Sequence, residues 1–395
     1  MGFRIVNPYF LYIASFALAL TVYQLGWSVY FPPLSASLLF FFCLTFLMAG
    51  IFAYNQYKAP GEYYRPIEVS GRKALMITAV LVVAWAIEFI FNGGIPLVDM
   101  LRGQRYDYRT FGMPTFHVVV VTFASFFATY LFHGFLSSRK RIFLWLCVLN
   151  LLPAILIMNR GMLLLNLSSC AFVYLLSLEG NQISFRWVFT CIAATVIVLF
   201  LFGVLGNFRL SNNLGRLYDR HLVFESGEAH ESLRNSWLPS EFFWTYFYLS
   251  APLGNLQHNV YNAHPEHSLS TFAIFINNEL VPDAISKRVN AWAGLKPRQR
   301  LQVADHLNAS TVFGGAYYYF GWAGMAMVFL VLILIAQFFC SWQMLRTGRY
   351  GVTCLAVLNT LFLFLIFDNL LVFSGFSFQF FYPFAAIMFQ RLFKN

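Results

Sequence analysis

The sequence predicts an all-α polytopic membrane protein, a chain that crosses the bilayer many times. Of its 395 residues, 59% are hydrophobic and 11% are charged, against about 25% charged in ordinary soluble domains. The mean hydropathy is +0.64. The apolar residues fall in long runs, and a bilayer core about 30 Å thick needs roughly 20 such residues per helix. Lipid is therefore the expected solvent for most of the chain.

Ten apolar runs predict about ten transmembrane helices. They divide the chain into seven spans in residues 1–206, a long loop at 207–311 and three spans in residues 312–395. The predicted spans lie near 8–30, 34–54, 74–92, 114–136, 142–158, 161–178, 186–206, 312–341, 351–373 and 376–391.

The Lys and Arg residues of the short loops predict the orientation. Cytoplasmic loops carry an excess of positive charge, so both termini are expected in the cytoplasm. On that side lie Arg4, Lys58, Arg65, Arg72, Lys73, Arg139, Lys140, Arg141, Arg186, Arg346, Arg349, Arg391 and Lys394, against Arg102, Arg105, Arg109 and Arg160 on the other. The net charge of +10 follows from this asymmetry, and no nucleic-acid partner is implied.

The long loop at 207–311 is expected on the outward-facing side. It holds six of the eight histidines of the chain, namely His221, His230, His258, His264, His267 and His306. Loops of this length are usually functional or form a small domain of their own. Within it, residues 242–252 are apolar and aromatic but too short to span. We expect them to lie along the membrane surface or to form a re-entrant helix.

Arg160 stands between two apolar runs, where a charge is costly unless it is paired or faces water. Asn159-Arg160-Gly161 is expected to form the tight turn that opens a helix. The amides of a helix N-terminus favour an anion, and an arginine beside them adds a fork of donors for phosphate. The alternative is a turn arginine that extends its side chain to the membrane surface.

Further arginines are predicted on the same surface. Arg102, Arg105 and Arg109 have spacings that place them on one face of a helix, and Arg209 and Arg216 follow the seventh span. Together they favour binding of a phosphate or pyrophosphate, with about 1.5–3 kcal/mol for each charge-assisted hydrogen bond. For Arg102, Arg105 and Arg109 the alternative is a solvated helix face on which Asp99 and Asp107 are their partners. For Arg209 and Arg216 the alternative is that each anchors the chain at the membrane surface.

Two acids, Glu88 and Asp368, are predicted inside spans. They could form a proton or ion relay, as in a transporter, or pair with polar groups within the bundle. A third interpretation, a membrane acyltransferase, rests on His133 alone. The sequence contains no DxD, HExxH or phosphate-loop motif, and His264-Pro-Glu-His267 has only a loose metal-ligand spacing. A metal-dependent glycosyltransferase or protease is therefore disfavoured.

The chain resembles the O-antigen polymerase (Wzy) and O-antigen ligase group of bacterial membrane proteins. The resemblance rests on the Gly-Ile-Pro-Leu stretch at 94–97 with Phe111-Gly112, and on Asn159-Arg160-Gly161 between two spans. It also rests on Gly206-Asn-Phe-Arg209 before the long loop, on residues 250–255 within it, and on residues 308–324 where the chain re-enters the membrane.

The resemblance implies a metal-independent, inverting glycosyltransferase of the bacterial inner membrane with a GT-C-like helical fold and no cofactor. Its donor would be a glycan on undecaprenyl pyrophosphate. The acceptor would be another lipid-linked repeat unit in a polymerase, or lipid A core in a ligase. A chain-length regulator protein is an implied partner. The alternative from another class is a lipid-linked glycan flippase or transporter.

The resemblance also implies roles for individual residues. Some members carry an Arg-x10-Gly pattern in their loops, which Arg216 and Gly227 fit, whereas Arg102, Arg105 and Arg109 have no such partner. His306 matches where ligase-type members carry a functional histidine, and Tyr317 and Tyr318 could stack on sugar rings. Alternatively, His306 is a loop histidine without a role in catalysis, and the two tyrosines belong to an aromatic belt at the membrane surface. The site predicted here is Arg160 and His306 for catalysis, with the other arginines and both tyrosines binding substrate.

Overall fold

The computed structural model describes residues 6–58, 64–102, 111–178, 185–213, 217–297, 299–341 and 348–392. In this part of the chain the secondary structure is helical, and one isolated bridge joins Ser28 to Ala229. Six described helices are long and apolar enough to cross a membrane, which confirms the prediction of a helical membrane protein. They are α2 (Ala36–Lys58), α3 (Gly71–Phe91), α5 (Phe116–Ser138), α7 (Arg160–Ser177), α8 (Phe185–Asn213) and α14 (Gly314–Ser341).

Three further apolar helices are shorter: α1 (Pro8–Tyr23), α6 (Arg141–Leu156) and α16 (Gly351–Phe364). The segments predicted at 8–30 and 351–373 were too long, because each helix ends early. After Tyr23 the chain turns through Gly26, whose φ of 61° suits glycine. After Phe364 it turns again, and the backbone amide of Asn369 donates to the carboxylate of Asp368 at 2.8 Å.

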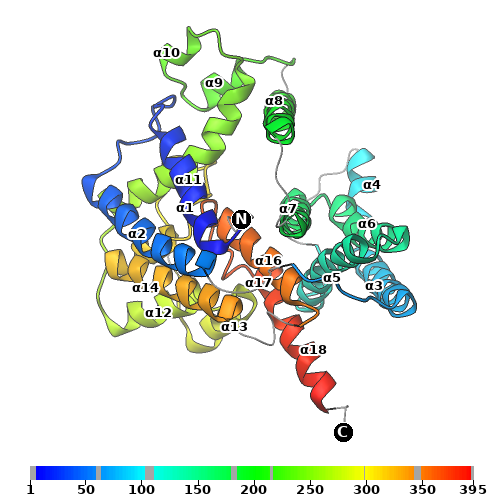
Figure 1. The fold of residues 1–395 in the computed structure, drawn as a ribbon. Coiled ribbons are helices and arrows are strands. Elements are labelled where there is room, and N and C mark those ends of the chain that lie inside the picture. The colour runs from blue at the N-terminus through cyan, green and yellow to red at the C-terminus, as the bar shows by residue number, and fades with distance from the viewer. Residues whose placement is uncertain are drawn as a thin grey trace.

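The helices pack in two groups, which Figure 1 shows on opposite sides of the molecule. The larger group encloses a core of α1, α2, α14, α16 and α11 (Glu241–Asn262), rich in fully buried aromatic rings such as Phe16, Phe42 and Phe313. The second group packs α3 and α6 against α5. α5 also contacts α7 and α16. It is therefore the most buried of the six candidate spans, since 72% of its apolar 18-residue stretch is buried inside the protein.

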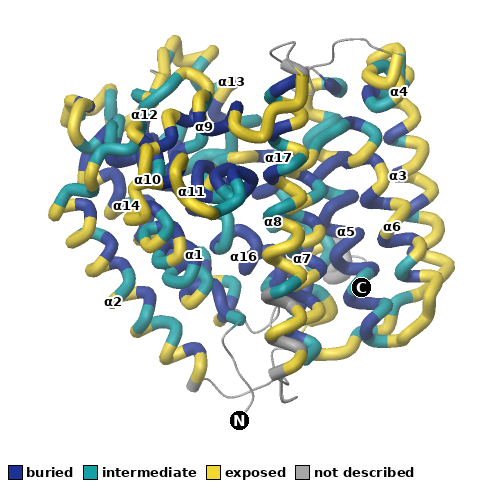
Figure 2. The backbone as a smooth tube through the Cα atoms, turned by 90° about the horizontal axis from the view of Figure 1, so that it is seen from above, coloured by how far each residue is buried: buried dark blue, intermediate teal, exposed yellow. Residues whose placement is uncertain are grey.

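The long segment between α8 and α14 gathers at one end of the bundle, opposite the N-terminus (Figure 2). We call this the loop end. It carries α4 (Pro96–Leu101), α9 (Leu222–Ser226), α10 (Glu231–Arg234), α12 (Leu269–Glu279) and α13 (Asp283–Ala293). Beyond α16 the chain forms α17 (Ser374–Ser377), a 3-10 turn (Phe378–Phe380) and α18 (Phe381–Leu392), which projects from the bundle in Figure 1.

The helix expected at 242–252 is α11, and it is twice as long as predicted. It runs for 22 residues from Glu241 to Asn262. It packs against α1, α8 and α14 rather than lying on the surface. Two glycines of α8 allow the close approach, because a side chain at Gly203 would overlap the backbone of Glu241 and one at Gly206 would overlap the ring of Trp244.

The second half of α11 is polar yet buried, which is why the apolar pattern did not reveal it. Asn255 donates through Nδ2 to the carbonyls of Leu307 at 2.6 Å and Ala309 at 2.7 Å. Asn259 donates to the carbonyl of Leu301 at 2.8 Å. These amides bind the chain before α14 to the helix, and each satisfies backbone groups that have left water.

Replacing Asn255 with alanine should lower the thermal midpoint of the detergent-solubilised protein. The change leaves two buried carbonyls and the amide of Val303 without their partner, at about 1–3 kcal/mol for each group. Asn262→Ala is the matched control, because its side chain is exposed and donates only within its own helix turn. Equal midpoints for the two variants would contradict this role of Asn255.

Candidate functional site

A polar cavity of about 880 Å³ opens at the loop end. Its walls come from the end of α12, the segment before α14, the first turns of α14 and the turn after α16. We call it the loop-end cavity. It is lined by Glu279, Gln299, Arg300, Gln302, Asp305, Asn308, Ala309, Tyr319, Phe367 and Asp368. Its volume lies within the range of about 300–1,000 Å³ that is usual for small-molecule sites.

Glu279 is the buried acid of this cavity, with 7% of its surface exposed. Asn369 donates through Nδ2 to the backbone carbonyl of Glu279 at 2.9 Å and to its Oε2 at 3.4 Å. Position 315 is glycine where α14 begins, and a side chain there would overlap the carboxyl group of Glu279. Burial raises the pKa of Glu279 to about 7, although the charge of Arg300 acts in the opposite direction. The carboxyl group can therefore take or release a proton near neutral pH.

Arg300 and Asp368 form an ion pair across the cavity, with 3.5 Å between Nη1 and Oδ1. Both side chains are partly exposed, at 30% and 56%, so the pair remains open to an incoming ligand. The sequence placed Asp368 inside the ninth span. That prediction was wrong, because α16 ends at Phe364 and the acid belongs to the turn that follows.

A smaller pocket of about 280 Å³ lies next to the cavity and shares Tyr319 with it. It is lined by Asn262, Ala263, His264, Glu266, Thr271, Ile274, Leu301, Tyr318 and Tyr319. Tyr318, predicted to bind substrate, is therefore a pocket residue. Tyr317 is buried instead, donates its hydroxyl to the carbonyl of Val260 at 3.3 Å and packs edge-on against Trp322.

The described members of the predicted arginine set, Arg102, Arg160 and Arg209, lie outside both pockets. Arg160 begins α7 as expected, where Asn159 caps the helix by accepting from the amide of Met162 at 2.9 Å. Its side chain is exposed, as are those of Arg102 and Arg209. None of these three guanidinium groups forms a hydrogen bond or ion pair with a residue that the structure describes. Arg105, Arg109 and Arg216 lie outside the described residues.

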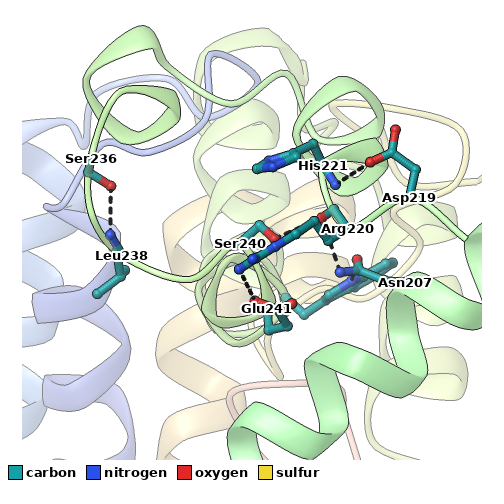
Figure 3. A network of polar contacts seen from close by, with 9 residues as sticks. Asn207, Asp219, Arg220, His221, Ser236, Leu238, Ser240 and Glu241 are labelled. Atoms are coloured by element: carbon teal, nitrogen blue, oxygen red, sulfur yellow. Dashed lines mark hydrogen bonds and ion pairs between the residues drawn. The ribbon is translucent and has the colours of Figure 1, made fainter.

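Polar contacts around Arg220 join α8 to α11 (Figure 3). Arg220 pairs with the buried carboxylate of Glu241 at 3.2 Å. Asn207 donates to the carbonyl of Arg220 at 3.1 Å and accepts from the indole of Trp244 at 2.7 Å. Arg220 is thus neutralised, whereas Arg209 stays uncompensated among the described residues.

His306 does not line the cavity, although its neighbour Asp305 does. Its imidazole is exposed and contacts the rings of Tyr30 and Phe247, at 6.0 and 6.3 Å between centroids. This position lies against α11, on the other side of the segment from Asp305. The predicted role of His306 as a helper of the acceptor hydroxyl is not tested by this geometry.

The buried acid of α3, Glu88, pairs with a histidine. Its Oε2 lies 3.0 Å from Nδ1 of His117, and its Oε1 accepts from the amide of Met113 at 3.4 Å. Gly112, with a φ of 99°, packs directly on both side chains. The pair ties the start of α5 to α3, as the polar-pairing interpretation expected. His133 likewise has a partner within the protein, because its Nε2 lies 2.9 Å from the backbone carbonyl of Arg65.

Sequence reasoning missed Glu279 and Arg300. Two weak signals could have pointed to them. Glu279 is the last residue of α12, where a negative charge opposes the helix dipole and so indicates a purpose other than stability. Arg300 closes the basic run at 296–300, in the segment that leads back into the membrane.

Comparisons with known proteins give no relative for this chain. No family model, no curated protein and no solved structure matches it. Among the described residues, no group of three or more His, Cys, Asp or Glu side chains could hold a metal ion. The function must therefore be argued from the cavity and its surroundings.

Glu279→Gln should stabilise the folded protein above pH 7. The pKa of Glu279 is 4.5 in the unfolded chain and about 7 in the folded protein. Between these two pH values the unfolded chain ionises Glu279, whereas the folded protein keeps the proton. Rising pH therefore costs stability across this window, up to about 3 kcal/mol at 1.36 kcal/mol per pKa unit. The variant removes that cost, so its gain in thermal midpoint should appear at pH 8 and vanish near pH 4.5.

Glu231→Gln is the control for this measurement, because Glu231 is an exposed acid on the same long segment. Its thermal midpoint should follow that of the wild type at every pH. A Glu279→Gln variant that is less stable than the wild type at pH 8 would contradict the assignment of a buried, proton-holding carboxyl group.

Proposed function

We propose that this protein is an O-antigen-type polysaccharide polymerase. It would transfer a growing glycan from undecaprenyl pyrophosphate to a lipid-linked repeat unit at the periplasmic face of the bacterial inner membrane. The observation that supports this most is the loop-end cavity, a large hollow lined by carboxyl, amide and aromatic side chains at the end of membrane helices. A glycan on a lipid anchor must react at such a place, just outside the hydrocarbon.

The chemistry required is modest and fits these side chains. Pyrophosphate is a good leaving group, so the donor needs charge stabilisation more than it needs an acid. The acceptor hydroxyl needs a base or a positioning partner. Glu279 supplies a carboxyl group near neutral pKa, and the exposed arginines supply cations.

The orientation completes the proposal. The positive-inside bias of the short loops supports a loop end that faces the periplasm and termini that face the cytoplasm. We assign the short helices α1, α6, α16 and α18 to further spans or half-spans, which gives about ten in a GT-C-like arrangement. Arg102, Arg160 and Arg209 would then lie on the periplasmic side, exposed and available to a pyrophosphate.

Deletion of the gene in its host, followed by gel analysis of lipopolysaccharide, tests the proposal. A polymerase predicts that the ladder collapses to core carrying a single repeat unit, and that the wild-type gene restores it. If lipid-linked polymer accumulates and no repeat reaches the core, the protein is the ligase. An unchanged ladder and an unchanged pool of lipid-linked glycan would exclude both activities for O-antigen and favour another glycan or a transporter of another substrate.

Arg160→Ala should abolish chain growth in the same complementation assay while leaving the protein folded. The guanidinium is exposed and has no partner among the described residues, so its removal costs the fold little. Its loss removes a charge-assisted contact to the donor, worth about 1.5–3 kcal/mol and hence about a 10- to 100-fold fall in rate. At the upper end of this range no long-chain ladder should be visible on the gel.

Arg186→Ala is the matched control, since Arg186 is also an exposed arginine in the first turn of an apolar helix but at the opposite end of the bundle. It should complement fully. A normal ladder with Arg160→Ala, at wild-type protein level, would remove Arg160 from the proposed site.

A further inference from the structure

The loop-end cavity has the wrong charge for a phosphate. Among its described lining residues, the acids Glu279, Asp305 and Asp368 face one cation, Arg300, and that cation is already paired with Asp368. A pyrophosphate here would meet like charges at close range, in surroundings where water screens poorly. The described arginines predicted to hold it, Arg102, Arg160 and Arg209, do not line the cavity, so a different occupant suits the described lining better.

The lining suits the hydroxyl groups of a sugar. Carboxylates accept hydrogen bonds from hydroxyls, and the amides of Gln299, Gln302 and Asn308 both donate and accept. Tyr319 and Phe367 add two aromatic walls for the apolar face of a ring. A few placed polar groups beside aromatic surface are typical of sites that orient a small ligand.

Glu279 differs from the other acids of the cavity because it is held in one place. It is buried, whereas Asp305 and Asp368 are exposed at the rim. Asn369 binds its carboxyl group from one side, and Gly315 leaves room for it at the start of α14. A fixed carboxylate that reaches a cavity from its wall can meet one particular hydroxyl of a bound sugar.

We infer that the loop-end cavity is the acceptor-sugar subsite of the proposed polymerase, and that the Glu279 carboxylate is the base that accepts the proton of the attacking hydroxyl. The inference rests on the proposed function and adds to it the location and substrate class of one half-site. The donor pyrophosphate would bind outside the cavity, and the exposed arginines are the candidates to hold it.

The step balances without a further reactant. The acceptor oxygen forms a bond to the anomeric carbon of the donor, on the face opposite the leaving group. The bond from that carbon to the pyrophosphate oxygen breaks, and its electron pair leaves with undecaprenyl pyrophosphate. The hydroxyl proton passes to Glu279, which releases it to solvent through the cavity before the next turn.

The acidic lining also sets a specificity. A uronic acid would bring another carboxylate towards Asp305 and Asp368, and like charges at short range are repelled. A neutral sugar binds without this penalty, and an amino sugar gains an attraction. The acceptor sugar of this enzyme is therefore neutral or amine-bearing.

The test uses the full-length purified protein and the lipid-linked repeat units that accumulate in the deletion strain. Chain growth is measured from pH 5 to 9 for the wild type, Glu279→Gln and the control Glu231→Gln. Binding is measured by calorimetry with the free repeat-unit oligosaccharide, released from the lipid by mild acid. Size-exclusion chromatography confirms that each variant is folded.

Glu279→Gln should lose about 100-fold or more in turnover, the usual contribution of a general base, while binding the oligosaccharide within about threefold of the wild type. Wild-type turnover should rise with pH through about 7, and the residual rate of the variant should not. Glu231→Gln should match the wild type. Wild-type turnover in Glu279→Gln, or equal losses of binding and turnover, would overturn the role of Glu279.

A failure of the proposed function gives a different result. If the wild type extends no lipid-linked repeat unit, the polymerase proposal fails. Binding of the oligosaccharide to the wild type would then still show whether the cavity is a sugar-binding site. Absence of binding by the wild type, or binding that Asp368→Asn leaves unchanged, would overturn the subsite as well.

Discussion

The hydrogen bonds between two asparagines of α11 and the chain before α14 hold the candidate site together. Asn255 and Asn259 bind backbone groups at residues 301–309, and this segment forms one wall of the loop-end cavity. Buried amides of this kind are costly unless every group is satisfied. Without them, the segment that carries Asp305 and Asn308 would lose its side-chain hydrogen bonds to α11.

The arrangement separates two kinds of charge at the loop end. Acids gather in the cavity, and the arginines Arg102, Arg160 and Arg209 are exposed outside it. A substrate with a sugar at one end and a pyrophosphate at the other meets both kinds of surface. In the proposed reaction, this separation would keep the hydroxyl nucleophile and the anionic leaving group on different surfaces.

The sequence predicted a helical membrane protein because apolar runs report burial in lipid directly, and six described helices are long and apolar enough to span. The count of ten spans stays a prediction. The sequence predicted the turn at Asn159-Arg160-Gly161 that opens α7 for a similar local reason, since the pattern of a turn before a helix is short. It missed the second half of α11, because residues such as Asn255 look solvent-exposed until their backbone partners, about 50 positions away, are known. Tyr317 seemed suited to a sugar ring, whereas the fold packs it in the core, and its predicted contact with a sugar stays a prediction.

The same limit applies to the candidate site. Glu279 and Asp368 are almost 90 positions apart, and only the fold brings them to one cavity with Arg300. Neither spacing nor composition could reveal this, whereas Arg160 was visible because a charge between apolar runs is unusual. The arginines could be listed from sequence, but the cavity needed the structure.

The most direct measurement is a structure of the protein in a lipid nanodisc with its lipid-linked repeat unit bound. The account predicts sugar density in the loop-end cavity, with a hydroxyl within hydrogen-bond distance of Glu279, and pyrophosphate density outside it beside Arg160. Pyrophosphate bound at Arg300 inside the cavity, or a cavity free of sugar while the ligand binds elsewhere, would contradict the account.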